Sequence, residues 1–314
     1  MKNNKIHIFF ACDDGYVPFL AVALTSLREN ANKRRSYAIK ILNTGISECY
    51  KERIKNTFSA PKFSIDFVDV SEAVESISEK LHTRDYYSKS TYYRLFIPNL
   101  FPDVDKALYL DGDIVLTGDV SKLYDTELCD NLVGAVHDSF VGSVDILKSY
   151  VTNRVGVDSS DDYFNAGVLV MNLKAMREMD FEKVFINLVG AVKFDVAQDQ
   201  DYLNVICRGR CTHIGYEWNC MPGFTSIGDA HKLIHYNLDN KPWKKKVPYG
   251  NYFWEYAIRS GFEQEILAAK KKCTRAAQKK AAEETKNLCT VAYGQAMDKR
   301  ENRRIKREIC RIVG

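Results

Sequence analysis

Apolar, β-prone runs alternate with helical patterns in the first part of the chain. The run 6–11 is followed by a helical pattern that opens at Pro18, and proline suits the first turn of a helix. Runs at 38–42 and 63–68 flank a helical stretch that begins after Ser47, a residue type favoured at helix N-caps. Strands separated by helices are typical of an α/β fold with a Rossmann-like, mainly parallel sheet flanked by helices.

The same alternation continues through the middle of the chain. In parallel α/β sheets ligands bind beyond the carboxyl ends of the strands, so polar residues that follow a strand are candidates for a site. The pattern predicts strands over 107–110, 167–171 and 232–236, and helices over 90–100, 174–192 and from Asp199 onward.

The C-terminal segment differs from the rest of the chain in composition and charge. The 314 residues carry a net charge of +4, but residues 268–314 hold fourteen Lys and Arg against five Asp and Glu. From about Gln264, Ala, Lys, Arg and Glu predominate, which favours helix. We therefore predict a main domain over 1–267 and a basic helical extension over 268–314.

Two interpretations of this extension stay open. The pattern suits a helix that lies on an anionic membrane surface, and it equally suits a solvated helix whose apolar stripe packs on the domain. Nucleic acid is not an expected partner, because no nucleic-acid-binding motif accompanies the charge. The helical spacing interleaves four arginines with three isoleucines: Arg303, Arg304, Arg307 and Arg311 with Ile305, Ile309 and Ile312.

The apolar runs and the cysteines indicate the compartment. No run approaches the 18 or so apolar residues of a membrane span, and the stretch 6–12 is too short for a signal peptide. Nine scattered cysteines in a chain of this size indicate reduced thiols, so we expect a cytoplasmic protein. Cys207, Cys211 and Cys220 lie near His213, but their spacing is not that of a known zinc site.

Two carboxylates interrupt an apolar run. Asp111 and Asp113 flank Gly112 between the runs 107–110 and 114–115. Burying carboxylates without a partner is costly, and a divalent cation held together with diphosphate oxygens would supply one. Oxygen ligands favour Mg²⁺ or Mn²⁺, although an isolated Asp-x-Asp is also a common turn.

Further polar residues follow other predicted strands. His235 ends a strand and Lys241 follows on a loop; imidazole is an ordinary Mn²⁺ ligand and an ammonium group suits phosphate. Asp13 and Asp14 follow the first strand, where they suit a nucleoside or a helix cap. The segment 165–167 precedes a predicted strand and suits close contact with a sugar ring or a simple turn. The segment 198–201 opens a helical pattern, where its acidic residues suit the start of a helix.

Taken together, these motifs resemble glycosyltransferase family 8, the retaining enzymes of the GT-A fold that include bacterial lipopolysaccharide galactosyl- and glucosyltransferases. The resemblance covers about three quarters of the chain. It depends on the segments 11–16, 90–95, 108–115, 164–168, 199–201 and 235–243. The chain departs from the family where members often have Asn in place of Gly15 and Gly in place of Leu238.

The resemblance implies a role for each matched residue. Mn²⁺, or Mg²⁺, would bind the diphosphate of UDP-galactose or UDP-glucose, and a glycan would be the acceptor. The metal ligands would be Asp111, Asp113 and His235. The donor contacts would be Ala11 and Asp13 to uridine, Lys241 to the diphosphate, and Arg94, Asp111, Asn165, Gly167, Asp199 and Gln200 to the sugar.

Two mechanisms of retention are compatible with these roles. Asp199 would be the nucleophile of a double displacement, or the acceptor would attack on the face from which UDP leaves while the Gln200 oxygen stabilises positive charge on the ring.

The acceptor would meet 138–162 and 215–224. The expected activity is therefore hexose transfer from a UDP-sugar to a glycan such as lipopolysaccharide, at the inner membrane face. The alternatives are a protein- or self-glycosylating enzyme, a sugar-nucleotide binding protein without turnover, and a metal-dependent nucleotidyltransferase or phosphohydrolase.

Overall fold

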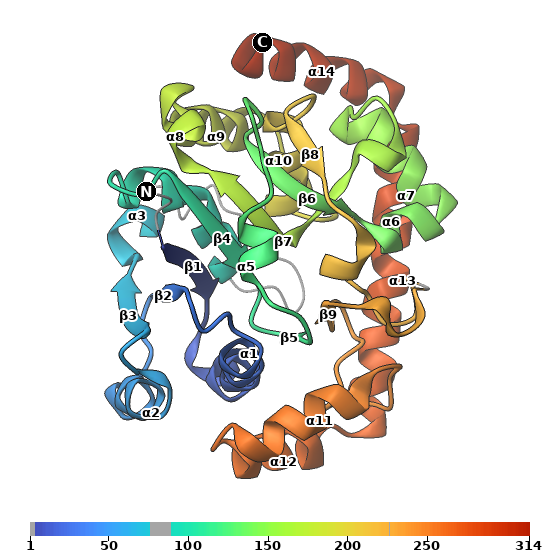
Figure 1. Cartoon of the computed structure of the whole chain (residues 1–314). Coiled ribbons are helices and arrows are strands. Elements are labelled where there is room, and N and C mark those ends of the chain that lie inside the picture. The colour runs from blue at the N-terminus through green and yellow to red at the C-terminus, as the bar shows by residue number, and fades with distance from the viewer. Residues whose placement is uncertain (1–3, 76–88, 226) are drawn as a thin grey trace. The chain divides into compact units, whose positions relative to one another are not determined.

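The computed structural model describes residues 4–75, 89–225 and 227–314 (Figure 1). The chain groups into two compact units. Unit 1 comprises Met1–Ser71, Ala107–Glu127 and Gly215–Ala282, and unit 2 comprises Glu72–Lys106, Leu128–Ile214 and Glu283–Gly314.

Unit 1 is built on parallel strands in the order β3-β2-β1-β4. These strands are β1 (Lys5–Ala11), β2 (Ser36–Asn43), β3 (Phe63–Asp69) and β4 (Lys106–Leu110), and a small antiparallel pair joins β5 (Ile114–Leu116) to β9 (Leu233–His235). The helical elements of this unit are η1 (Asp14–Tyr16), α1 (Val17–Glu29), α2 (Glu48–Phe58), α5 (Ser121–Tyr124), η5 (Tyr216–Trp218), η6 (Gly228–Ala230), α11 (Gly250–Arg259) and α12 (Glu263–Lys272).

The core of unit 1 lies around β1 and α1. The residues from Val17 to Leu27 of α1 are all buried, as expected of a helix that is apolar on every side. This helix packs against α11 and β5. The sequence pattern therefore predicted the first three strands and both intervening helices correctly.

Unit 2 contains an antiparallel pair, β6 (Val133–His137) and β7 (Phe164–Asn172), with β8 (Cys211–His213) parallel to β6. Its helical elements are η2 (Lys89–Phe96), α4 (Ile97–Leu100), α6 (Ser139–Ser143), α7 (Asp145–Tyr150), η3 (Val151–Val155), η4 (Ser160–Asp162), α8 (Leu173–Glu178), α9 (Phe181–Ala191), α10 (Asp199–Ile206) and α14 (Lys299–Val313). Helix α3 (Ser71–Glu75) and helix α13 (Arg275–Met297) each include residues of both units.

Two predicted helices differ from the structure. The single helix expected over 174–192 is two helices, α8 and α9, because Asp180 has a left-handed backbone with φ of 53° that ends one helix and starts the next. The helix expected over 90–100 begins as the 3₁₀ segment η2 and becomes α-helical only at Ile97, since Pro98 has no N–H to bond the carbonyl of residue 94 and is tolerated only in the first turn of α4.

The C-terminal extension is helical, as the composition predicted. The proposed domain boundary at residue 267 falls within α12, so that division of the chain stays a prediction. In α14, Ile305 and Ile309 are buried and the helix packs against α9 and η3. Within the described ranges, no helix is both long and apolar enough to cross a lipid bilayer.

Candidate active site

The turn 111–113 connects two strands that belong to different sheets. The sequence analysis expected Asp111 and Asp113 to interrupt one strand, whereas the structure ends β4 at Leu110 and starts β5 at Ile114. In the β5–β9 pair, Ile114 lies opposite His235. This register brings a residue more than one hundred positions away to the side of the two carboxylates.

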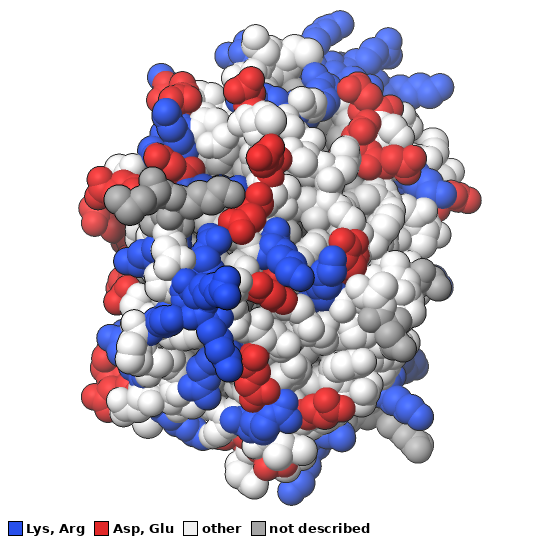
Figure 2. Space-filling view, viewed as in Figure 1, with Lys and Arg blue, Asp and Glu red and all other residues white. Residues whose placement is uncertain are grey.

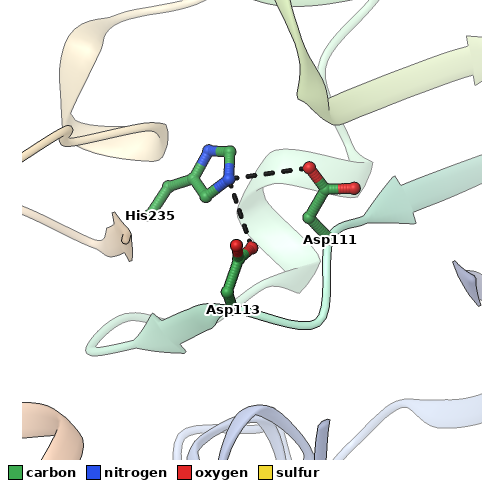
Figure 3. A group of neighbouring side chains, drawn as sticks. All are labelled: Asp111, Asp113 and His235. Atoms are coloured by element: carbon green, nitrogen blue, oxygen red, sulfur yellow. Dashed lines mark ion pairs between the residues drawn. The ribbon is translucent and has the colours of Figure 1, made fainter. Parts of the chain in front are cut away.

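Asp111, Asp113 and His235 form a compact cluster (Figure 3). The Nε2 atom of His235 lies 3.3 Å from Asp113 Oδ1 and 3.6 Å from Asp111 Oδ2. Among the described residues, this is the one group of acidic, His and Cys side chains with the spacing of a metal site, its ligand atoms lying within 4.8 Å of one another. The cysteines and histidine at 207–220, whose sequence spacing does not match a known zinc site, are described residues and form no such group.

The hydrogen bond on the far side of the ring sets the chemistry of His235. Its Nδ1 lies 2.9 Å from the amide oxygen of buried Asn219. Because that oxygen can only accept, Nδ1 carries a proton, and Nε2 is the ring atom that faces both carboxylates. Three possible ligand atoms therefore converge, and a divalent cation fits among them.

The second oxygen of Asp113 is held by positive charge. Its Oδ2 contacts the Nζ of buried Lys241 and accepts a hydrogen bond from the Tyr16 hydroxyl at 3.2 Å. Burial raises the pKa of Asp113, but the charge of Lys241 together with His235 outweighs it and holds the pKa well below its usual value. Within the described part of the chain, Asp113 Oδ1 makes no hydrogen bond, which leaves it free to bind a cation.

An aromatic cluster holds the segment that carries Lys241. The ring of Trp243 stacks on Phe19 of α1, with centroids 3.9 Å apart and planes 14° from parallel. Tyr16 packs edge-on against both rings. Offset and edge-on aromatic pairs of this kind stabilise a local arrangement by about 1 kcal/mol beyond their buried area.

The acidic residues after β1 have local structural roles. Asp13 is the N-cap of η1 and accepts from the Tyr16 amide at 3.0 Å, and Asp14 accepts from the Ser47 amide at 2.8 Å. The capping interpretation of Asp13 is therefore confirmed, while Ser47 makes no side-chain cap of its own. The predicted contacts of Ala11 and Asp13 with uridine stay predictions.

A second cluster of predicted residues lies in unit 2, where Arg94 and Asp199 form a buried ion pair. Arg94 Nε is 3.1 Å from Asp199 Oδ2 and also donates to the Thr91 carbonyl, and another guanidinium nitrogen donates to the carbonyl of Ala166. These contacts attach η2 to β7 and to the start of α10.

Gln200 lies beside this pair in a network of amides. Its oxygen accepts from the Ala166 amide at 3.0 Å and from Asn165 Nδ2 at 3.3 Å, and its Nε2 donates to Asp138 at 3.0 Å. Asn165 Oδ1 in turn accepts from the Gly167 amide at 3.0 Å. The segment 165–167 thus lies within β7, rather than in front of a strand as the pattern suggested.

A buried carboxylate fixes the first turn of α10. Asp201 accepts from Tyr150 at 2.8 Å, from Tyr163 at 2.7 Å and from the Ala197 amide at 3.0 Å. Burial raises its pKa to about 6 despite these bonds. The preceding Gln198 has a strained backbone with φ of 49°, which the bonds of Asp201 help to hold.

Comparison with known proteins identifies the family. The model of glycosyl transferase family 8 matches residues 7–247. The chain belongs to glycosyl transferase family 8. A lipopolysaccharide 1,2-glucosyltransferase of Escherichia coli is 25% identical over 269 residues, which is 80% of this chain and 76% of that protein.

Two solved structures resemble this family 8 protein. The galactosyltransferase LgtC, solved with donor and acceptor sugar analogues, is 27% identical with a TM-score of 0.68, and the match covers 81% of this chain and 96% of LgtC. The bifunctional glycosyltransferase WbbM, without ligand, is 31% identical with a TM-score of 0.72 over 84% of this chain. The chain matches about half (51%) of the WbbM chain. These similarities confirm the predicted GT-A fold.

Three side chains that contact candidate residues were not predicted as individual contacts. Tyr16 and Asn219 lie in segments that the sequence singled out, but their hydrogen bonds to Asp113 and His235 depend on tertiary packing. Asp138 directly follows β6, so it carries the same signal as the other candidates. That signal was missed because the run 133–137 was not predicted as a strand.

The backbone of Leu238 explains one departure from the family pattern. Leu238 has a left-handed conformation with φ of 51°. Glycine adopts this conformation without the steric conflict between Cβ and the backbone, which costs other residues about 1–2 kcal/mol. The position where family members often have glycine is thus strained in this glycosyltransferase.

We expect Leu238→Gly to be more stable than Leu238→Ala by up to about 1 kcal/mol, the reverse of the usual order for these residues. Both variants remove the Leu side chain, so their difference isolates the Cβ in the left-handed backbone. Urea unfolding of the two variants measures it. An alanine variant that is the more stable of the two would contradict the strain.

The raised pKa of Asp201 predicts that the stability of the fold depends on pH. The folded protein keeps the Asp201 proton up to about pH 6, whereas an unfolded Asp loses it near 4, so this carboxyl favours folding below pH 4 and its contribution is lost as the pH rises through 6. The destabilisation caused by Asp201→Asn should therefore be largest near pH 4 and shrink by on the order of 2 kcal/mol at pH 7. Urea unfolding from pH 4 to 8 measures this, with Asp66→Asn at an exposed position as the control. A difference that does not vary with pH would refute it.

Proposed function

We propose that this glycosyl transferase moves a hexose, galactose or glucose, from a UDP-sugar to a glycan acceptor such as lipopolysaccharide or another cell-surface saccharide. The transfer retains the anomeric configuration and depends on Mn²⁺, with Mg²⁺ as the alternative ion. The LgtC structure with donor and acceptor analogues and the E. coli glucosyltransferase support this choice of substrates. The resemblance of the site motifs to the retaining family supports the stereochemistry.

The single observation that carries the proposal is the convergence of Asp111, Asp113 and His235. Two carboxylates repel one another unless positive charge lies between them, and a divalent cation with Nε2 as a third ligand would supply that charge. Asn219 holds the ring in the orientation that points Nε2 at both carboxylates. The donor set is of the type that Mn²⁺ accepts, because it mixes oxygen ligands with one imidazole.

When bound, the ion supplies Lewis-acid stabilisation of the negative charge that develops on a departing nucleoside diphosphate. Lys241 adds a second positive charge beside the proposed metal ligands. Its Nζ contacts Asp113 and would exchange this carboxylate for a phosphate oxygen of the donor. Tyr16 donates to the same carboxylate and keeps it aligned. No side chain is then required to protonate the leaving group.

In unit 2, we propose that Arg94, Asn165, Gly167, Asp199 and Gln200 bind the donor sugar. Arg94 neutralises Asp199, which favours hydrogen bonding of that carboxylate to sugar hydroxyls over its attack on the anomeric carbon. The Gln200 amide presents a dipole held by three hydrogen bonds. A dipole that need not reorient is effective at stabilising charge that appears only in the transition state.

Asp113→Ala should lower the rate of Mn²⁺-dependent UDP release from UDP-galactose and UDP-glucose by at least a hundredfold. The variant loses a ligand and leaves Lys241 buried without this partner. Electron paramagnetic resonance of free Mn²⁺ measures the loss of binding directly, and enzymatic detection of UDP measures turnover.

The matched control is Asp66→Ala, which removes an exposed aspartate of β3 and should change neither quantity. Unchanged turnover and Mn²⁺ binding in Asp113→Ala would overturn the metal assignment. Release of pyrophosphate or inorganic phosphate in place of UDP would reassign the protein to nucleotidyl transfer or phosphate hydrolysis.

We also propose that the enzyme is cytoplasmic and contacts the inner membrane face through α14. All nine cysteines are free thiols, which suits a reducing compartment. Since Ile305 and Ile309 pack on unit 2, the helix would bind lipid by charge and not by inserting its apolar stripe. Figure 2 shows the Lys and Arg side chains projecting where Figure 1 places α14. The exposed ones are Lys299, Arg300, Arg303, Arg304, Lys306, Arg307 and Arg311.

Removing Arg300, Arg303 and Arg307 together by substitution with Ala should weaken binding to vesicles that contain anionic phospholipid by roughly a hundredfold, at about 1 kcal/mol per charge. Cosedimentation with vesicles of mixed phosphatidylglycerol and phosphatidylcholine measures this. The control removes Lys174, Lys183 and Lys193, three exposed charges elsewhere in unit 2. Equal binding by both triple variants and the wild type would dismiss α14 as a membrane contact.

A further inference from the structure

Asp138 is a buried carboxylate that contacts two of the proposed donor-binding residues. It follows β6 and is the N-cap of α6, where its Oδ1 accepts from the Val141 amide at 2.9 Å. Its Oδ2 accepts from both Asn165 Nδ2 and Gln200 Nε2, each at 3.0 Å. Only 4% of Asp138 is exposed, so these bonds form in a site from which water is largely excluded.

The hydrogen-bond partners of Gln200 permit only one orientation of its side-chain amide. The group at one end is the Ala166 N–H, which can only donate and therefore requires the amide oxygen. The group at the other end is the Asp138 carboxylate, which accepts and therefore requires the amide NH₂. Rotating the amide by 180° would place two donors together and two acceptors together.

We propose that Asp138 is a positioning residue that acts on the reaction only through Gln200, whose side-chain amide it holds in one orientation. The inference rests on the proposed function in one respect, which is that Gln200 acts on the donor sugar. The Asp138 carboxylate also accepts from Asn165, which donates to the Gln200 oxygen, so this second contact supports the same orientation of Gln200. Hydrogen bonds to a charged acceptor are about twice as strong as neutral ones, which suits an orienting role.

The first experiment tests the contact without any substrate. Gln200→Glu places a second carboxylate against Asp138, and like charges at hydrogen-bond distance raise the pKa of one of them. The folded variant then loses stability as that proton leaves, so its Tm relative to the wild type should fall by roughly 5 °C between pH 5 and 8. Scanning calorimetry at several pH values measures this.

The matched control exchanges the two groups. Asp138→Asn in the Gln200→Glu background restores one amide and one carboxylate with their positions reversed, and the introduced amide oxygen still caps α6 at Val141. The pH-dependent fall in Tm should therefore disappear in the double variant. A fall of the same size in the double variant, or no fall in Gln200→Glu, would overturn the assigned contact.

The second experiment tests whether Asp138 acts through Gln200. Asp138→Asn should lower kcat for transfer from the UDP-hexose by about tenfold or more with little change in KM, because the donor still binds but the amide is no longer held. In a Gln200→Ala background, Asp138→Asn should lower kcat no further. An equal loss in both backgrounds would show that Asp138 acts independently of Gln200, and would overturn the proposal.

The two experiments separate failure of this inference from failure of the proposed function. A wild-type protein that releases UDP from no UDP-hexose refutes the function, while the Tm values of the wild type, Gln200→Glu and the double variant still decide whether Asp138 contacts Gln200. An active wild-type enzyme with additive effects of the two substitutions keeps the function and rejects the positioning role. If Asp138→Asn does not fold, the pH dependence of Gln200→Glu alone decides the contact.

Discussion

The structure of unit 1 around the site depends on the need to balance two carboxylates placed at the end of a buried strand. Asp113 is almost fully buried, and burial by itself opposes its charge. Lys241, Tyr16 and His235 each contribute a compensating contact. The register of β5 against β9 and the aromatic stack of Trp243 on Phe19 serve to bring these groups to one place.

In unit 2, hydrogen bonds and an ion pair hold the polar side chains in place. The Arg94–Asp199 ion pair and the amides of Asn165 and Gln200 are joined by side-chain and backbone hydrogen bonds, and Asp201 anchors the same helix start from within the core. Each group has its partners before any ligand arrives. Little reorganisation is then needed when charge develops on a bound molecule, which is the basis of electrostatic preorganisation.

The C-terminal helix shows how packing resolves a pattern that has two interpretations. Interleaved Arg and Ile residues fit a helix on an anionic membrane surface and a solvated helix that packs its apolar stripe on the domain equally well. Burial of Ile305 and Ile309 against α9 and η3 uses the apolar stripe within the protein and leaves a basic outer face. The charge pattern is thus a property of the sequence, while the availability of the apolar side chains is a property of the fold.

Local patterns determined most of the strands and helices, because alternation of apolar residues and helix-start signals act over a few neighbouring positions. They also singled out Asp111, Asp113 and His235, since polar residues that follow apolar runs stand out, whereas the role expected of Gln200 came from the resemblance to the family. Tertiary structure alone decided that Ile114 pairs with His235, that Asn219 orients the imidazole and that Asp138 meets Gln200. Those contacts join residues from 16 to 121 positions apart, and only the folded chain brings such distant donors and acceptors to hydrogen-bonding distance.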